Sequence, residues 1–85
     1  MNTAYVAIGA NIGDPAATVL AAFAALANLT DSRVVHTSSL YRTAPVGLKN
    51  QPDFINAVAA LETGLAPESL LDALLDLEAR FGRIR

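Results

Sequence analysis

The sequence predicts a single α+β domain over residues 1–85, with the element order βαββα. Two kinds of periodicity support this prediction. Three segments have the apolar or alternating pattern of strands, and two segments repeat apolar residues at helical spacing after a proline. The chain has no cysteine and 53% hydrophobic residues. Its stability is therefore expected to come from apolar packing rather than from disulfides.

Residues 4–10 form the first predicted strand. This run is apolar almost throughout, which is typical of a strand that is covered on both faces or lies centrally in its sheet. Gly9 and Gly13 then predict a tight turn with positive φ. The turn matches neither GxGxxG nor the P-loop pattern, and Asp14 would repel an anion. A structural turn is therefore favoured over a phosphate site.

The first predicted helix starts at Asp14-Pro15 and runs to about Asn28. Asp is a good N-cap, and Pro is favoured at the first helical position. The apolar face includes Val19, Phe23 and Leu26.

Residues 33–43 form the second predicted strand. Strict alternation assigns two faces, one with Val35, Thr37, Ser39, Tyr41 and Thr43, the other with His36, Ser38, Leu40 and Arg42.

Phe54–Thr63 is the third predicted strand, and its two faces differ. Ile55, Ala57, Ala59 and Leu61 form an apolar face, which is expected to meet the helices; Phe54, Asn56, Val58 and Ala60 form the other.

The segment 41–56 between the second and third strands is either a surface connection or a binding loop. The polar residues Thr43 and Asn56 at its strand ends favour binding. Phe54 and Asn56 would then face a possible ligand.

The second predicted helix starts at Pro67 and ends before Gly82, a natural C-cap. Glu78, at the edge of its apolar stripe, could face a pocket or the rim of the core. The stripe contains Leu70, Leu74, Leu77 and Phe81, widened by Leu71 and Leu75.

Arg83 and Arg85 follow this helix and would point to one side of an extended segment. They could clamp a polyphosphate or form a solvated basic tail. His36 has no carboxylate partner in sequence and is interpreted as a satisfied or solvent-facing side chain rather than a functional one. The acidic residues are scattered and form no metal-ligand cluster, so no metal site is predicted in this chain.

The order βαββα is five-sixths of the split-βαβ, ferredoxin-like unit βαββαβ, and the fourth strand is missing.

The net charge of −2 argues against a nucleic-acid partner. No stretch of 18 uncharged apolar residues and no signal peptide occur, so we expect a soluble cytoplasmic protein without a membrane partner.

The chain resembles the N-terminal half of the 6-hydroxymethyl-7,8-dihydropterin pyrophosphokinase family. Residues 4–14 (AYVAIGANIGD) resemble its opening strand and turn. Residues 38–47 (SSLYRTAPVG) and 51–63 (QPDFINAVAALET) resemble its most specific N-terminal block. Residues 74–85 (LLDLEARFGRIR) resemble its second helix and the basic segment that follows. The likeness covers this whole chain and about half of the family's length.

This resemblance implies a transferase of folate biosynthesis, a kinase that moves pyrophosphate from ATP to the hydroxymethyl group of the pterin and releases AMP. It implies a pterin ring stacked on Phe54 and read by the amide of Asn56. It also implies a mobile loop over residues 44–52 that closes over the substrates. Pterin contacts are implied for Thr43, Ala44, Val46, Phe54 and Asn56, and ATP contacts for Leu71, Glu78, Arg83 and Arg85.

The chain departs from the family in three respects. Ala44 replaces a frequent proline, and Phe54 replaces a frequent tyrosine, so stacking is kept and a hydroxyl is lost. The family's Mg²⁺-binding aspartates fall beyond Arg85. Phosphoryl transfer depends on metal neutralisation of charge, so no catalytic residue is expected here and this portion is expected to be inactive alone. We expect the coding sequence to continue past Arg85 into a segment with paired aspartates.

An alternative from another class is a non-catalytic βαββα binding or assembly module. It would complete its sheet by pairing with a partner chain or with itself through the open sheet edge. A nucleic-acid-binding ferredoxin-like domain is disfavoured, because its strands would need exposed aromatic residues in a basic surround.

Overall fold

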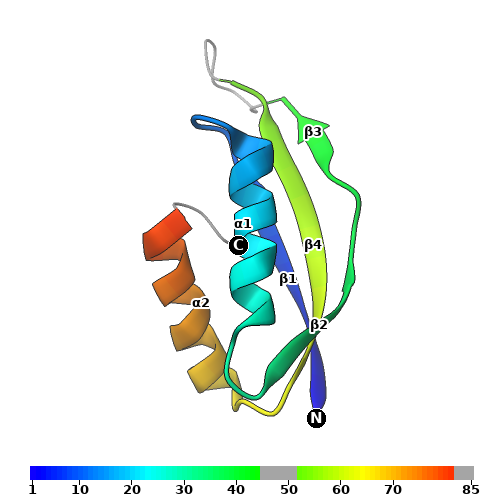
Figure 1. Cartoon of the computed structure of the whole chain (residues 1–85), viewed down its shortest axis with the longest axis vertical. Helices are drawn as coiled ribbons and strands as arrows, with labels where there is room; N and C mark the ends of the chain where they lie inside the picture. Colours follow the sequence, from blue (N-terminus) through cyan, green and yellow to red (C-terminus); the bar gives the residue numbers. More distant parts are fainter. Residues whose placement is uncertain (45–51, 82–85) are drawn as a thin grey trace.

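The computed structural model describes residues 1–44 and 52–81, which form helices packed on one antiparallel sheet (Figure 1). β4 lies between β1 and β2, and β3 also pairs with β4. The predicted order of strands and helices is confirmed, except that the second predicted strand is divided into β2 and β3. The arrangement is consistent with a partial ferredoxin-like fold. The elements are β1 (Asn2–Ala10), α1 (Pro15–Ala27), β2 (Ser32–Thr37), β3 (Tyr41–Thr43), β4 (Phe54–Thr63) and α2 (Pro67–Phe81).

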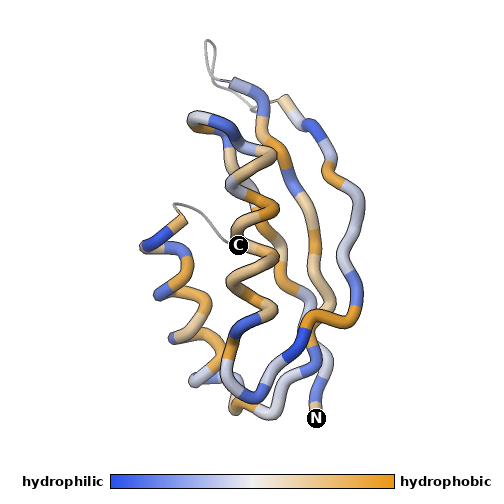
Figure 2. The backbone as a smooth tube through the Cα atoms, viewed as in Figure 1, coloured by the Kyte–Doolittle hydropathy of each residue, from blue (hydrophilic) through white to orange (hydrophobic). Residues whose placement is uncertain are grey.

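The core lies between α1 and one face of the sheet, here called the helix face. The opposite side of the sheet is called the outer face. In Figure 2 apolar colouring runs along α1 and along the strands behind it. The predicted apolar face of β4 is confirmed as part of this core. The buried cluster contains Val6, Ile8, Ala10, Val19, Ala22, Leu26, Ala57, Ala59 and Leu77.

β1 differs from its prediction. In the described part of the chain it pairs with β4 alone, so it lies at an edge of the sheet. Only its helix face is covered: Val6 and Ile8 are buried, whereas Tyr5 is 77% exposed on the outer face. The outward positions of this run carry Tyr5, Ala7 and Gly9, none of which is charged, so the sequence reads as apolar almost throughout. For that reason the alternation of buried and exposed residues along β1 could not be recognised in the sequence.

The turn before α1 is partly as predicted. Gly13 has a φ of +68°, but Gly9 lies inside β1 and has no positive φ. The predicted helix start is confirmed, because the Asp14 carboxylate accepts a hydrogen bond from the Ala17 amide over 3.2 Å and Pro15 is the first helical residue.

β2 contains a bulge. Between the pairs Val34–Leu61 and His36–Ala60 this strand advances by two residues while β4 advances by one. Val35 is the extra residue and is exposed. Because side chains alternate along a strand, an extra residue reverses the faces of all residues after it.

A second extra residue separates β2 from β3. From Thr37, opposite Ala59, to Tyr41, opposite Asn56, the chain advances by four residues while β4 advances by three. Thr37 therefore belongs to the helix face and Tyr41 to the outer face. The prediction that Thr37, Tyr41 and Thr43 share one face is wrong, since it assumed an unbroken strand.

α2 confirms part of its predicted stripe. Leu77 is buried, and Leu74 and Phe81 pack against the core. Leu71 and Leu75 were predicted to widen the buried stripe, but they are 56% and 53% exposed. The reason is that α2 packs against α1 and not over a strand of the described sheet. The predicted C-cap, Gly82, lies outside the described residues.

Candidate functional site

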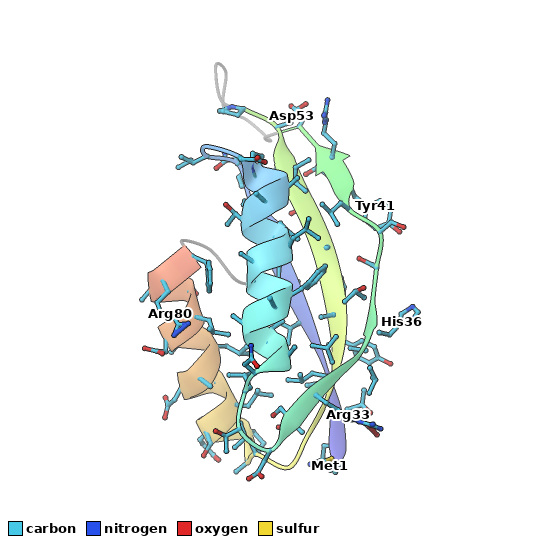
Figure 3. The ribbon with its side chains drawn as sticks, viewed as in Figure 1. Met1, Arg33, His36, Tyr41, Asp53 and Arg80 are labelled. Carbon is cyan, nitrogen blue, oxygen red and sulfur yellow. The ribbon has the colours of Figure 1, made fainter. Side chains whose placement is uncertain are left out.

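The candidate site lies where β3 meets the start of β4 on the outer face. Thr43 is opposite Phe54, and Tyr41 is opposite Asn56. Residues that pair across an antiparallel sheet share a face, so all four lie on one side. The predicted co-facial placement of Phe54 and Asn56 is thereby confirmed. In Figure 3, Tyr41 and Asp53 mark this end of the sheet. We call Thr43, Phe54 and Asn56 the strand-end site.

The side chains of Thr43 and Asn56 are joined directly. Asn56 Nδ2 donates a hydrogen bond to Thr43 Oγ1 over 2.7 Å. The two extra residues cancel in their effect on the faces but shift the register by two residues, so Thr43 lies on the outer face opposite Phe54 and next to Asn56. The hydrogen bond orients the carboxamide and leaves one N–H and the Oδ1 acceptor for other partners. Such an amide can pair with the donor–acceptor edge of a flat heterocycle.

Phe54 and Asn56 are both half-buried. They are two residues apart on one strand, so their side chains are neighbours on the same face. An aromatic ring beside an oriented amide offers a stacking surface together with polar contacts. Small-molecule sites typically combine apolar walls with a few well-placed polar groups.

Two neighbours of this site were not among the predicted residues. Tyr41 is 58% exposed and lies opposite Asn56 on β3, while Gly9 lies opposite Asn56 on β1. No sequence motif marks either one. The regular β1–β4 register places Gly9 beside Asn56, and the two extra residues between Val34 and Tyr41 set the register that places Tyr41 there.

The remaining predicted pterin residues lie after β3. Ala44 follows β3 directly and is exposed. Val46 and most of the predicted loop 44–52 lie outside the described residues. The described part therefore brings together three of the five predicted pterin residues, with Ala44 adjacent in sequence.

Of the predicted ATP residues, those that the structure describes are Leu71 and Glu78, and they lie away from the strand-end site. Leu71 is exposed and Glu78 half-buried, both on α2, which contacts α1. Figure 1 shows α1 between α2 and the β3–β4 end of the sheet. Arg83 and Arg85 lie outside the described residues. The described chain thus does not bring the two predicted sets into contact.

The position of His36 and the arrangement of the acidic residues also bear on the site. His36 is exposed on β2, as interpreted from the sequence. Within the described ranges, no three His, Cys, Asp or Glu residues lie close enough together to hold a metal ion. A membrane-spanning helix was also not found in these ranges.

Comparison with known proteins gives a consistent result. A family model described as 7,8-dihydro-6-hydroxymethylpterin-pyrophosphokinase matches residues 5–85. A 2-amino-4-hydroxy-6-hydroxymethyldihydropteridine pyrophosphokinase of Haemophilus influenzae is 45% identical over 85 residues, which are 100% of this chain and 53% of that protein. The Pseudomonas aeruginosa protein of the same name is 47% identical over 95% of this chain and 50% of its own length.

A longer relative matches the same region. The folic acid synthesis protein fol1 of Schizosaccharomyces pombe is 39% identical over 96% of this chain and 11% of its own length. The chain spans about half the length of the bacterial relatives that it matches.

Proposed function

The chain belongs to the 7,8-dihydro-6-hydroxymethylpterin-pyrophosphokinase family, and we propose that it forms the pterin-binding part of an enzyme that transfers pyrophosphate from ATP to 6-hydroxymethyl-7,8-dihydropterin. In this reaction the pterin hydroxymethyl oxygen attacks the β-phosphorus of ATP and loses its proton to solvent, the bond between that phosphorus and the oxygen bridging to the α-phosphate breaks, and AMP leaves. The cytoplasm is the proposed location.

The observation that carries this proposal is the oriented amide of Asn56. Its Nδ2 is held by Thr43 over 2.7 Å, and Phe54 lies beside it on the same face. A pterin is a flat heterocycle with alternating donors and acceptors on one edge. We propose that Asn56 pairs with this edge while the ring stacks on Phe54, with Thr43 setting the angle of the amide. Ala44 and Val46 are proposed to line the same pocket.

The nucleotide end of the proposed site involves α2 and the residues that follow it in the sequence. Leu71 and Glu78 are proposed to contact ATP from α2, and Arg83 and Arg85 to bind its phosphates through their guanidinium groups. These residues are supported by the match of residues 5–85 to the family model.

Magnesium would supply charge neutralisation during the transfer. The described residues do not fit such an ion, because no group of three potential ligands occurs among them. No step of the reaction is therefore assigned to the metal here, and we propose that this 85-residue portion is inactive by itself.

A second candidate function is supported by the free edge of β1. In the described part β1 has one partner strand, β4. An unpaired strand edge is a template for pairing with another chain. The second candidate is therefore a non-catalytic assembly module that completes its sheet with a second copy of itself.

Asn56→Ala tests the first proposal. We expect the affinity for 6-hydroxymethyl-7,8-dihydropterin to fall by about 1–3 kcal/mol, since the substrate loses its polar partner. Affinity for ATP should not change. Isothermal titration calorimetry on the complete protein measures both. Asn2→Ala, at an exposed position of β1, is the matched control. Unchanged pterin affinity in Asn56→Ala would remove the strand-end site from the proposal.

A further inference from the structure

We infer that Gly9 is a positioning residue for Asn56, and that the absence of a side chain at Gly9 sets the direction of the pterin-reading amide. Gly9 and Asn56 are opposite each other in the β1–β4 register. A Cβ added at Gly9 would lie 2.8 Å from Asn56 Oδ1 and 3.9 Å from its Cγ. The amide oxygen thus occupies the space that any other residue at position 9 would fill.

The backbone does not explain the glycine at this position. Gly9 lies within the regular strand β1 and has no positive φ, unlike Gly13. Tyr5 and Ala7, which share its face on β1, carry side chains. What distinguishes Gly9 is the close approach of the Asn56 amide, so the requirement is for space rather than for backbone freedom.

Asn56 is consequently constrained from both neighbouring strands. On the β3 side its Nδ2 donates to Thr43 Oγ1, and on the β1 side its Oδ1 rests over Gly9. The hydrogen bond and the free space together keep the amide lying across the strands. An oriented amide can form hydrogen bonds with a bound heterocycle without first losing rotational freedom.

A methyl group at position 9 should move the amide without unfolding the strand. The atom in its way is the far end of a side chain, which can rotate about the terminal torsion. Rotation relieves the clash, but it turns Nδ2 away from Thr43 Oγ1. Gly9→Ala is therefore expected to affect ligand recognition more than stability.

The inference has two separate tests, because its functional part rests on the proposed function whereas its structural part does not. The structural test follows the side-chain NH₂ resonances of Asn56 by ¹⁵N NMR. These resonances are identified as the ones that disappear in Asn56→Ala. In Gly9→Ala these resonances should shift and exchange faster with water. The control is Gly64→Ala, where the new Cβ would meet its nearest atom at an ordinary 3.7 Å.

The functional test is calorimetry with 6-hydroxymethyl-7,8-dihydropterin and with ATP on the complete protein. Gly9→Ala should weaken pterin binding by about tenfold, the scale of one lost hydrogen bond, and change ATP binding less than about twofold. In the Asn56→Ala background, Gly9→Ala should have no further effect on pterin affinity, because its action passes through Asn56.

Several results would overturn the inference. One is a Gly9→Ala protein whose Asn56 resonances match those of wild type. Another is that Gly9→Ala lowers pterin affinity by the same factor in the wild-type protein and in the Asn56→Ala background. If Gly9→Ala does not fold, Asn56→Ala should restore folding by removing the clash; failure to do so also rejects it. If wild type binds no pterin, the proposed function is wrong, while the NMR result still decides the role of Gly9.

Discussion

At the scale of single residues, the site depends on how Asn56 is held. Its amide is held by Thr43 and has room because Gly9 has no Cβ. The side chains of Asn56 and Thr43 are uncharged and Gly9 has none, so the orientation does not rely on ion pairs. In the described part the one ion pair, between Arg33 and Glu62, is at the other end of β4, with the Arg33 side chain 73% exposed. Such exposed pairs contribute little to stability.

Thr43→Val is the prediction that belongs to this scale. Valine keeps the shape of threonine but cannot accept the bond from Asn56 Nδ2. We expect the free energy of unfolding to fall by about 0.5–1.5 kcal/mol and pterin affinity to fall as well. Urea denaturation and calorimetry measure the two effects. Thr3→Val, at an exposed position of β1, should change neither. A Thr43→Val protein identical to wild type in both assays would contradict this role of the hydroxyl.

At the scale of elements, α1 provides the main support for the sheet. It contacts β1, β2 and β4, whereas α2 contacts α1. Leu26 and Val19 of α1 are fully buried against the helix face. This packing holds the helix face of β4 against α1, so its outer face can present Phe54 and Asn56 from a supported strand.

Leu26→Ala tests this support. Its side chain is 0% exposed, so its truncation should leave a cavity and lower the free energy of unfolding by about 2–5 kcal/mol. Leu20→Ala on the same helix is the matched control, since Leu20 is 56% exposed; a change below about 0.5 kcal/mol is expected. Both values come from urea denaturation. Equal losses for the two variants would mean that α1 is not packed as described.

At the scale of the whole molecule, the described chain has apolar surface that its own elements do not cover. Tyr5 is exposed on the edge strand β1, and Leu71 and Leu75 are exposed on α2. The described part is a two-layer arrangement, with helices on one side of the sheet only (Figure 1). Self-association through the free edge of β1 is the expected behaviour if the second candidate function is correct.

Sedimentation equilibrium over a range of concentrations tests this expectation. The assembly-module interpretation predicts a dimer that Ala7→Lys converts to monomer, because an outward lysine on an edge strand opposes strand pairing. Ala21→Lys places the same charge on the exposed side of α1 and should leave the dimer intact. A wild-type monomer at every concentration would reject this candidate and leave the pterin-binding proposal unaffected.

Local signals in the sequence were sufficient for the helix start at Asp14-Pro15 and for the two faces of β4. They act within a few residues, through a capping hydrogen bond in one case and the alternation of side chains in the other. The co-facial pair Phe54 and Asn56 could be predicted for the same reason.

Tertiary structure alone decided the rest. The residue that Thr43 meets on β4 depends on two extra residues between Val34 and Tyr41, and these have no recognisable composition. The approach of Gly9 to Asn56 joins residues far apart in the sequence. Strand register and helix neighbours result from the packing of distant segments, which no local pattern encodes. The sequence alone therefore determined the two helices, β1, β4 and the apolar faces of α1 and β4, whereas the three-dimensional pairing divided the remaining strand into β2 and β3 and determined how the site is assembled.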